Sequence, residues 1–146
     1  MKKLITILLI TVSIVSCEDK NEQHEKDIEL IKSYLKENNI TAESTNSGLH
    51  YTINTEGNGK NPTIDSWVKV SYRGKLLDES IFDEGITESY LTGYIQGWIE
   101  GLQYFSEGGS GTLFIPSRLG YGEMSKSSIP SNSVLIFDIE LLAVEN

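Results

Sequence analysis

Residues 93–102, with the sequence GYIQGWIEGL, constrain the fold of this chain more than any other segment. Their apolar residues recur at the i, i+3, i+4 and i+7 spacing of one helix face. These residues are Ile95, Trp98, Ile99 and Leu102. Glycines spaced four residues apart leave room for another element to approach. Taken alone, the segment predicts a core helix that buries its tryptophan. A membrane-helix packing motif is the weaker alternative, because Gln96 and Glu100 interrupt a run far shorter than the ~20 residues of a membrane span.

The segments around this helix alternate polar and apolar residues, as half-buried strands do. In residues 67–76, for example, Val68, Val70 and Tyr72 fall on one face. The predicted strands cover residues 49–53, 67–76, 81–83, 112–115 and 134–144. The predicted helix covers residues 95–105. Residues 84–93 are expected to form a loop or ragged strand, and residues 116–133 a long loop. Several strands, one central helix and one long loop predict an α+β domain.

The central segment and the blocks around it resemble the FKBP-type peptidyl-prolyl isomerases. The blocks are VSYRG (70–74), IFD (81–83), IP through LGYG (115–122), IP (129–130) and LIFDIELL (135–142), in the order that the family has them. The match covers residues 49–144. It implies a twisted antiparallel β-sheet wrapped around one central helix, with a pocket between them. We therefore expect an FKBP-type isomerase domain at residues 49–146, preceded by a short N-terminal helix.

The first 16 residues are predicted to form a signal peptide outside the fold. Two lysines precede a twelve-residue apolar run, which ends in the tripeptide VSC. This ending resembles the bacterial lipoprotein box, whose cysteine is lipidated and becomes the new N-terminus. A plain signal peptide that happens to precede a cysteine is the alternative. Cys17 is the only cysteine in the chain, so no internal disulfide can form. A lipidated Cys17 predicts a membrane-anchored lipoprotein of the bacterial cell envelope, on the inner or the outer membrane.

Residues 17–26 are then expected to form a solvated tether, because EDKNEQHEK contains no apolar residue. Residues 27–48 are expected to form a helix and a linker. Ile28, Ile31 and Leu35 have helical spacing, and two asparagines end the helix after residue 36. This short helix lies outside the family resemblance. Capping the domain, joining a dimer contact and packing only transiently are all open roles for it.

Composition and missing motifs exclude several functions. The net charge of −9 argues against nucleic-acid binding, which requires a basic face. His24 and His50 have no metal-ligand neighbours at a useful spacing. Motifs for a hydrolase nucleophile, a zinc protease and a phosphate loop do not occur in the sequence. We therefore expect no metal, no cofactor and no nucleic-acid partner, and a reaction, if any, that needs none of them.

Prolyl isomerisation is such a reaction. Rotation about the X-Pro bond meets a barrier of about 20 kcal/mol, and the twisted transition state has lost its amide resonance. A dry apolar pocket favours this less polar state over the planar, well-hydrated amide. A preference of about 4–7 kcal/mol accelerates rotation by about 10³–10⁵. The resemblance implies that the partners are X-Pro segments of unfolded or folding proteins.

The resemblance implies that Trp98 forms the floor of the pocket and that Tyr72, Phe82 and Phe137 form its aromatic walls. It also implies that Ile95 offers its backbone N–H to the substrate, that Tyr121 offers its hydroxyl and that Asp83 contributes a carboxylate. Two substrate-binding residues, Ile129 and Tyr94, are expected at the rim and mouth of the pocket. Simple core packing is the alternative for each aromatic residue taken singly, and a turn facing water is the alternative for Asp83.

The sequence departs from the family pattern at the pocket rim. Thr87 and Ser89 stand where aromatic residues are usual, Tyr94 stands where valine is usual, and residues 125–128 are rich in serine. A large macrolide inhibitor needs the rim as well as the floor, so we expect weakened macrolide binding. Short proline peptides occupy mainly the floor and should still be turned over.

Two other functions are compatible with the residues. The first is a non-catalytic module that binds proline peptides or a partner protein on the isomerase fold. The second is carbohydrate capture, which requires Trp67 and several tyrosines on one open face. The first alternative predicts peptide binding without acceleration, and the second predicts a row of exposed aromatic rings.

Overall fold

The computed structural model describes residues 15–146, so residues 1–14 of the predicted signal peptide lie outside the described part. Its elements follow the order helix, strands, short helices, strand, short helix and strand. They are α1 (Val15–Glu37), β1 (Glu43–Ser44), β2 (His50–Thr55), β3 (Trp67–Lys75), β4 (Ile81–Tyr90), the 3₁₀ turn η1 (Leu91–Gly93), α2 (Gln96–Gly101), the 3₁₀ turn η2 (Leu102–Tyr104), β5 (Ser110–Ile115), the 3₁₀ turn η3 (Ser117–Leu119) and β6 (Leu135–Glu145). The predicted α+β class is confirmed.

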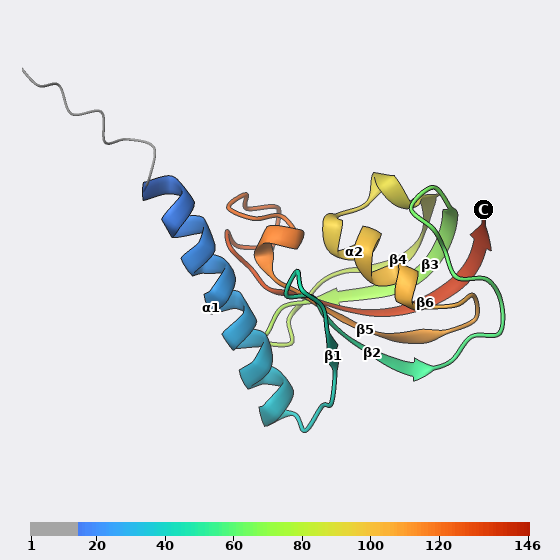
Figure 1. Cartoon of the computed structure of the whole chain (residues 1–146), viewed down its shortest axis with the longest axis horizontal. Coiled ribbons are helices and arrows are strands. Elements are labelled where there is room, and N and C mark those ends of the chain that lie inside the picture. Colours follow the sequence, from blue (N-terminus) through green and yellow to red (C-terminus); the bar gives the residue numbers. More distant parts are fainter. Residues whose placement is uncertain (1–14) are drawn as a thin grey trace, which may run out of the picture.

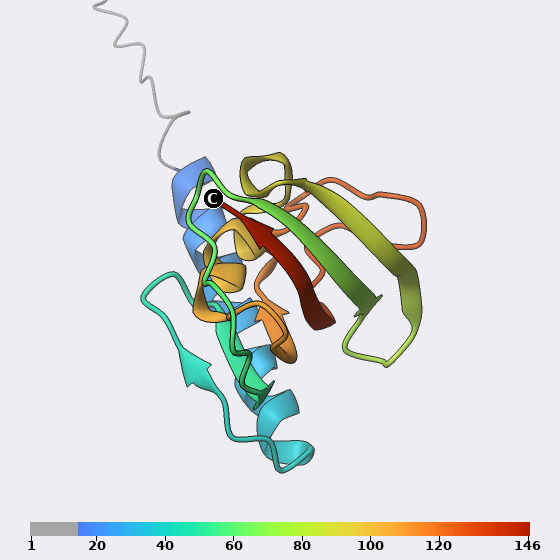
Figure 2. The ribbon, with the colours of Figure 1, turned by 90° about the vertical axis from the view of Figure 1, so that its right-hand side faces the viewer.

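One antiparallel sheet organises the domain. Its six strands lie in the order β1-β2-β5-β6-β3-β4, and every pairing is antiparallel. Figure 2 shows how strongly β6, β3 and β4 twist where they lie side by side. The segment 84–93, predicted as a loop or ragged strand, is mostly strand, because β4 pairs with β3 along its length and ends only at Tyr90. This pairing gives the pocket a continuous wall.

Helix α2 lies on one face of the sheet, and two of its glycines allow it to approach β5. A Cβ added to Gly97 would lie 2.5 Å from Ile115 Cγ2, and one added to Gly101 would lie 2.7 Å from Leu113 Cδ2. Real side-chain carbons need about 3.5–4.0 Å. Trp98 and Leu102 are buried between helix and sheet, so the core-helix prediction is confirmed.

Helix α1 packs on the opposite face at one end of the sheet, where Figure 1 shows it apart from α2. Ile31 and Leu35 form a separate apolar cluster with Phe114, Val134 and Ile136. Phe114 and Ile136 alternate along β5 and β6 with residues of the main core, so they face the other way. The nearly continuous apolar run of β6 therefore reflects a strand that is covered on both faces.

The predicted tether is wrong in its conformation. Residues 17–26 belong to α1, which runs unbroken to Glu37. His24 is buried against the domain, and Asp27 is fully buried. Charged residues on the outer face of a docked helix resemble a tether in composition, because only one stripe of the helix contacts the protein. Among the described residues, no helix is both long enough and apolar enough to cross a membrane.

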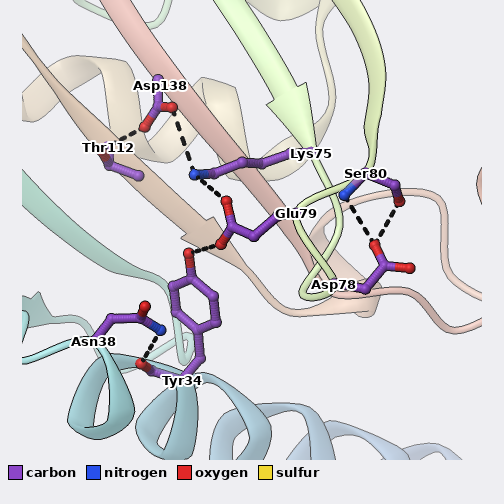
Figure 3. Close-up of polar contacts among 8 residues, drawn as sticks. All are labelled: Tyr34, Asn38, Lys75, Asp78, Glu79, Ser80, Thr112 and Asp138. Carbon is purple, nitrogen blue, oxygen red and sulfur yellow. Dashed lines mark hydrogen bonds and ion pairs between the residues drawn. The ribbon is translucent and has the colours of Figure 1, made fainter.

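A chain of polar contacts joins the C-terminal part of α1 to the sheet (Figure 3). The Tyr34 hydroxyl donates to Glu79 in the β3–β4 turn. Lys75 Nζ lies 2.8 Å from Glu79 Oε2 and 3.8 Å from Asp138 Oδ2. Thr112 Oγ1 donates to Asp138 Oδ1 at 2.8 Å. The Lys75 ammonium and the Tyr34 hydroxyl lower the pKa of Glu79, so the carboxylate that links helix to hairpin is held in its charged form.

Candidate active site

A pocket of about 350 Å³ opens between the N-terminal end of α2, the strands β3, β4 and β6, and the loop after η3. Eight of the nine pocket residues predicted from the sequence line it. The lining residues are Tyr72, Phe82, Asp83, Thr87, Gly93, Tyr94, Ile95, Trp98, Tyr121, Lys126 and Phe137. Two larger hollows lie elsewhere, a polar groove of about 640 Å³ on the outer face of the sheet and a cleft of about 430 Å³ beside α1. Neither of these two hollows has an aromatic cluster, so the smaller pocket is the candidate site.

Three aromatic rings, those of Tyr72, Tyr94 and Phe137, pack against the indole of Trp98. The centroid of Tyr72 lies 5.4 Å from that of Trp98 at 78°, and the centroid of Phe137 lies 5.2 Å away at 83°. Phe82 meets Phe137 edge-to-face at 5.4 Å. Edge-to-face rings are electrostatically favourable, and each holds the next in place. Trp98 and Phe137 are almost fully buried, while Phe82 is partly exposed. The result is an apolar floor with side walls, open at one end.

The floor contains an unpaired donor. Within residues 15–146, Trp98 Nε1 is buried and has no hydrogen-bond acceptor. A buried donor without a partner typically costs about 1–3 kcal/mol. Burial of the whole indole compensates for this, since a tryptophan side chain buries about 150–250 Å².

Gly74 sets the position of two rings. It lies in β3, directly between Asp83 of β4 and Phe137 of β6 in the strand register. A Cβ at this position would lie 2.5 Å from the Phe82 ring and 2.8 Å from Phe137 Cε1. Because Gly74 has no side chain, the rings of Phe82 and Phe137 can both pack over β3 at this position. The sequence contains this residue in the VSYRG block, but its role was visible only in the structure.

Tyr72 and Asp83 form the polar edge of the pocket. The Tyr72 hydroxyl donates to Asp83 Oδ2 at 2.8 Å. Partial burial, together with the hydrogen bond and the charge of Asp83, raises the pKa of Tyr72 to about 12. Asp83 itself is solvent-exposed on strand β4. The phenol therefore stays protonated at physiological pH and holds the carboxylate at the pocket edge.

Ile95 presents a free backbone donor. It precedes α2 as the N-cap residue, and its carbonyl accepts from Trp98 N–H at 2.9 Å and from Ile99 N–H at 3.1 Å. Its own N–H finds no acceptor among the described residues. N–H groups at a helix start commonly lack an intrahelical partner and are available to a ligand. The position agrees with the expected role of a donor to the substrate.

The altered rim contains a replacement wall. The Tyr94 ring lies 5.0 Å from Trp98, tilted by 39°, and its hydroxyl is 3.2 Å from Thr87 Oγ1. The threonine that stands in place of an aromatic residue thus fixes a tyrosine from the opposite side. Tyr90, the other candidate for this wall, is largely exposed.

The loop after η3 contributes Tyr121 and one residue that the sequence did not indicate. Lys126 Nζ lies 4.7 Å from the centroid of the Tyr121 ring, and both side chains line the pocket. Ile129, expected at the rim, is not among the lining residues. It is buried in the main core, and its N–H donates to the carbonyl of Lys126 at 2.8 Å. Its backbone holds Lys126, whereas its side chain is core packing.

An antiparallel sheet wrapped on a short helix, with an aromatic pocket at the helix start, defines an FKBP-like domain. The family model described as FKBP-type peptidyl-prolyl cis-trans isomerase matches residues 58–142. The FKBP-type peptidyl-prolyl cis-trans isomerase FkpA of Aeromonas hydrophila is 38% identical over 133 residues, which are 88% of this chain and 49% of that protein. FkpA of Escherichia coli is 37% identical over 133 residues, 88% of this chain and 48% of that protein. The chain belongs to the FKBP-type peptidyl-prolyl cis-trans isomerase family.

Solved structures agree with this assignment. The crystal structure of FkpA from Escherichia coli matches with a TM-score of 0.75 at 34% identity, over 88% of this chain and 62% of that one. A peptidyl-prolyl cis-trans isomerase from Pseudomonas syringae matches with a TM-score of 0.72 at 29% identity, over 84% of this chain and 96% of that one. The chain spans about half the length of the curated relatives it matches.

Proposed function

We propose that this protein is a peptidyl-prolyl cis-trans isomerase. The observation that carries the proposal is the pocket itself, in which Tyr72, Phe82, Trp98 and Phe137 form an apolar cavity next to the free N–H of Ile95. The pocket needs no proton transfer and no nucleophile. It lowers the barrier by favouring a twisted imide over a planar, hydrated one.

The pocket residues divide this task. The proline ring lies on Trp98, whose flanking rings exclude water from the rotating bond. The N–H of Ile95 donates to a substrate carbonyl and fixes the segment that does not rotate. Asp83, held by Tyr72, places its carboxylate near the carbonyl that does rotate. Rotation is then a unimolecular step in a low-polarity site.

Exchange spectroscopy on an Ala-Leu-Pro-Phe-type peptide tests the proposal. We expect substoichiometric protein to raise the rate of cis–trans exchange, and Phe82→Ala to abolish most of the gain. Equal exchange rates with and without stoichiometric protein would refute the proposal. Saturable peptide binding without acceleration would instead favour the non-catalytic binding module. The carbohydrate alternative requires Trp67 and several tyrosines on one open face; Trp67 does not line this pocket, so the site does not support that alternative.

We propose further that Cys17 is lipidated and anchors the protein in the bacterial cell envelope, where it assists the folding of exported proteins. The apolar run ending in VSC and the absence of any second cysteine support this proposal. One acyl chain binds a membrane only marginally, so stable anchoring needs more than one chain. Cys17→Ser should move the protein from the membrane to the soluble fraction or stall its processing. Wild-type protein recovered wholly in the soluble fraction would contradict the proposal.

We also propose that macrolide inhibitors bind this pocket more weakly than they bind typical small family members. Thr87 and Ser89 provide less apolar area than aromatic residues would, and Tyr94 covers only the side next to Trp98. Each lost aromatic contact forfeits up to about 1.5–3 kcal/mol of apolar burial. Calorimetric titration tests this, because nanomolar affinity would contradict it.

A further inference from the structure

We propose that Asp27, on the N-terminal helix, is a positioning residue for the isomerase pocket and that it orients Tyr121 through Ser117. The proposal rests on the function proposed above. Asp27 lies outside the family match and outside the pocket, and it is separated from Ser117 by 90 positions in the sequence.

The Asp27 carboxylate is fully buried and receives several hydrogen bonds. Gln23 Nε2 donates to Oδ1 at 2.7 Å. The backbone N–H of Ser117 donates to Oδ2 at 2.8 Å, and the Ser117 hydroxyl donates to the same oxygen. No lysine or arginine among the described residues forms an ion pair with this carboxylate. A buried carboxylate is costly without such donors, so its presence ties α1 to one residue, Ser117.

Ser117 passes this constraint to the loop that follows. It begins η3, and its carbonyl accepts from Gly120 N–H at 2.9 Å and from Gly122 N–H at 2.8 Å. These two glycines flank Tyr121. Gly122 has φ of +58°, which a side chain would disfavour, and its carbonyl accepts from Asn132 N–H at 2.8 Å. Ser117 is therefore bound to α1 through its N–H and hydroxyl groups, and its carbonyl binds the turn that contains Tyr121.

The contact between Asp27 and Ser117 affects the pocket because it fixes the turn that contains Tyr121. Tyr121 lines it together with Tyr72 and Lys126, and its ring contacts the main core. A functional group must stay within about 0.5 Å of its productive position to be effective. The turn around Tyr121 is a loop, and loops are positioned less tightly than strands. The hydrogen bonds that Asp27 accepts from Ser117 supply the rigidity that this loop needs.

An alternative is that Asp27 only fastens α1 to the domain. That role is already served by the apolar cluster around Ile31 and Leu35 and by the contact of Tyr34 with Glu79. The two roles give different results in a double-mutant cycle, because a residue that acts through Tyr121 loses its effect when the Tyr121 hydroxyl is absent.

The test uses the full chain with Asp27→Asn, Tyr121→Phe and the double variant. Glu29→Gln is the matched control, because it makes the same carboxylate-to-amide change at an exposed position of the same helix. We expect Asp27→Asn to lower kcat/KM about tenfold, mainly through kcat, and less than twofold in the Tyr121→Phe background. Glu29→Gln should leave kcat/KM unchanged. An equal loss in both backgrounds would overturn the proposal.

Amide hydrogen exchange provides a readout that does not depend on activity. We expect the Gly120 and Gly122 amides to exchange at least tenfold faster in Asp27→Asn, with the β5 amides unchanged. Unchanged exchange at both glycines would overturn the positioning role. If the wild type fails to accelerate proline exchange, the proposed function fails, while faster glycine exchange still supports the positioning geometry. If Asp27→Asn also exposes the β5 amides, Ser117→Ala, which removes only the hydroxyl bond, replaces it in the same cycle.

Discussion

Gly74→Ala should damage the pocket without replacing any of the side chains that line it. The added methyl group would lie 2.5 Å from Cε2 and Cζ of Phe82 and 2.8 Å from Cε1 of Phe137. Carbon atoms in contact need about 3.5–4.0 Å, so both rings must withdraw by about 1 Å. The backbone of β3 cannot yield easily, because it is paired on both sides, with β4 and with β6. The rings therefore move, and they move into the space that the proline would occupy.

Overpacking of this kind typically costs about 1–3 kcal/mol. Each 1.36 kcal/mol corresponds to a tenfold change in rate. If the whole cost falls on the pocket, kcat/KM decreases by about 5- to 150-fold. Exchange spectroscopy on a proline peptide measures this decrease, and a thermal melt of the same sample shows how much of the cost falls on folding.

The double variant with Phe82→Ala is the control. With that ring removed, the two closest contacts of the Gly74→Ala methyl group are gone and Phe137 Cε1 remains at 2.8 Å, so the second substitution should cost less than it does alone. A Gly74→Ala protein that keeps more than half of the wild-type kcat/KM and an unchanged Tm would refute the reasoning. It would show that the rings have room to shift and that the space above Gly74 does not position them.

Three further predictions concern single residues of the pocket. Phe82→Ala should lower kcat/KM more than Asp83→Ala does. Loss of the Phe82 ring admits water to the pocket, whereas loss of the Asp83 carboxylate changes only the local electric field. The reverse order in a peptide assay would contradict the dry-pocket account. Tyr94→Ala should weaken macrolide binding further in calorimetry, because the ring packs 5.0 Å from Trp98; an unchanged Kd would show that Tyr94 is not a wall. Tyr72 should titrate near pH 12, so the last step in tyrosinate absorbance should vanish in Tyr72→Phe. The raised pKa contributes stability that is complete below pH ~10 and is lost between about pH 10 and 12.

The sequence predicted the fold and most of the pocket because both depend on local patterns. Trp98 and Leu102 follow helical spacing, and the neighbouring glycines indicate close packing on a strand. Alternation placed Val68 and Val70 in the core correctly, and both are fully buried. The exact extent of β4 could not be predicted, since a strand whose side chains are mostly exposed has no apolar period and is stabilised by its partner strand.

The rim was harder to predict because it depends on contacts across the chain. Thr87 looked like a lost wall, but it forms a hydrogen bond with Tyr94, seven residues away. Ile129 looked like a rim residue, yet its side chain turns into the core and Lys126 faces the pocket instead. The first outcome depends on the turn between β4 and α2, and the second on the path of the loop after η3, which is rich in serine and glycine and for which periodicity carries no information.

The sequence did not decide whether the N-terminal helix packs on the domain, although one pattern in the strands indicated that it does. A sheet with a single covered face alternates apolar and polar residues, and most of β3 does so. Residues 134–137 do not alternate, and Phe114 adds a second apolar position on the same outer face. These side chains require a cover, and the predicted helix at residues 27–36 has Ile31 and Leu35 at the spacing to provide it. The buried carboxylate of Asp27 has no comparable signal, because an aspartate at the start of a predicted helix is also a common exposed cap. Only its distance of 2.8 Å from the Ser117 N–H distinguishes the two, which is why the link from α1 to the pocket emerges from the structure alone.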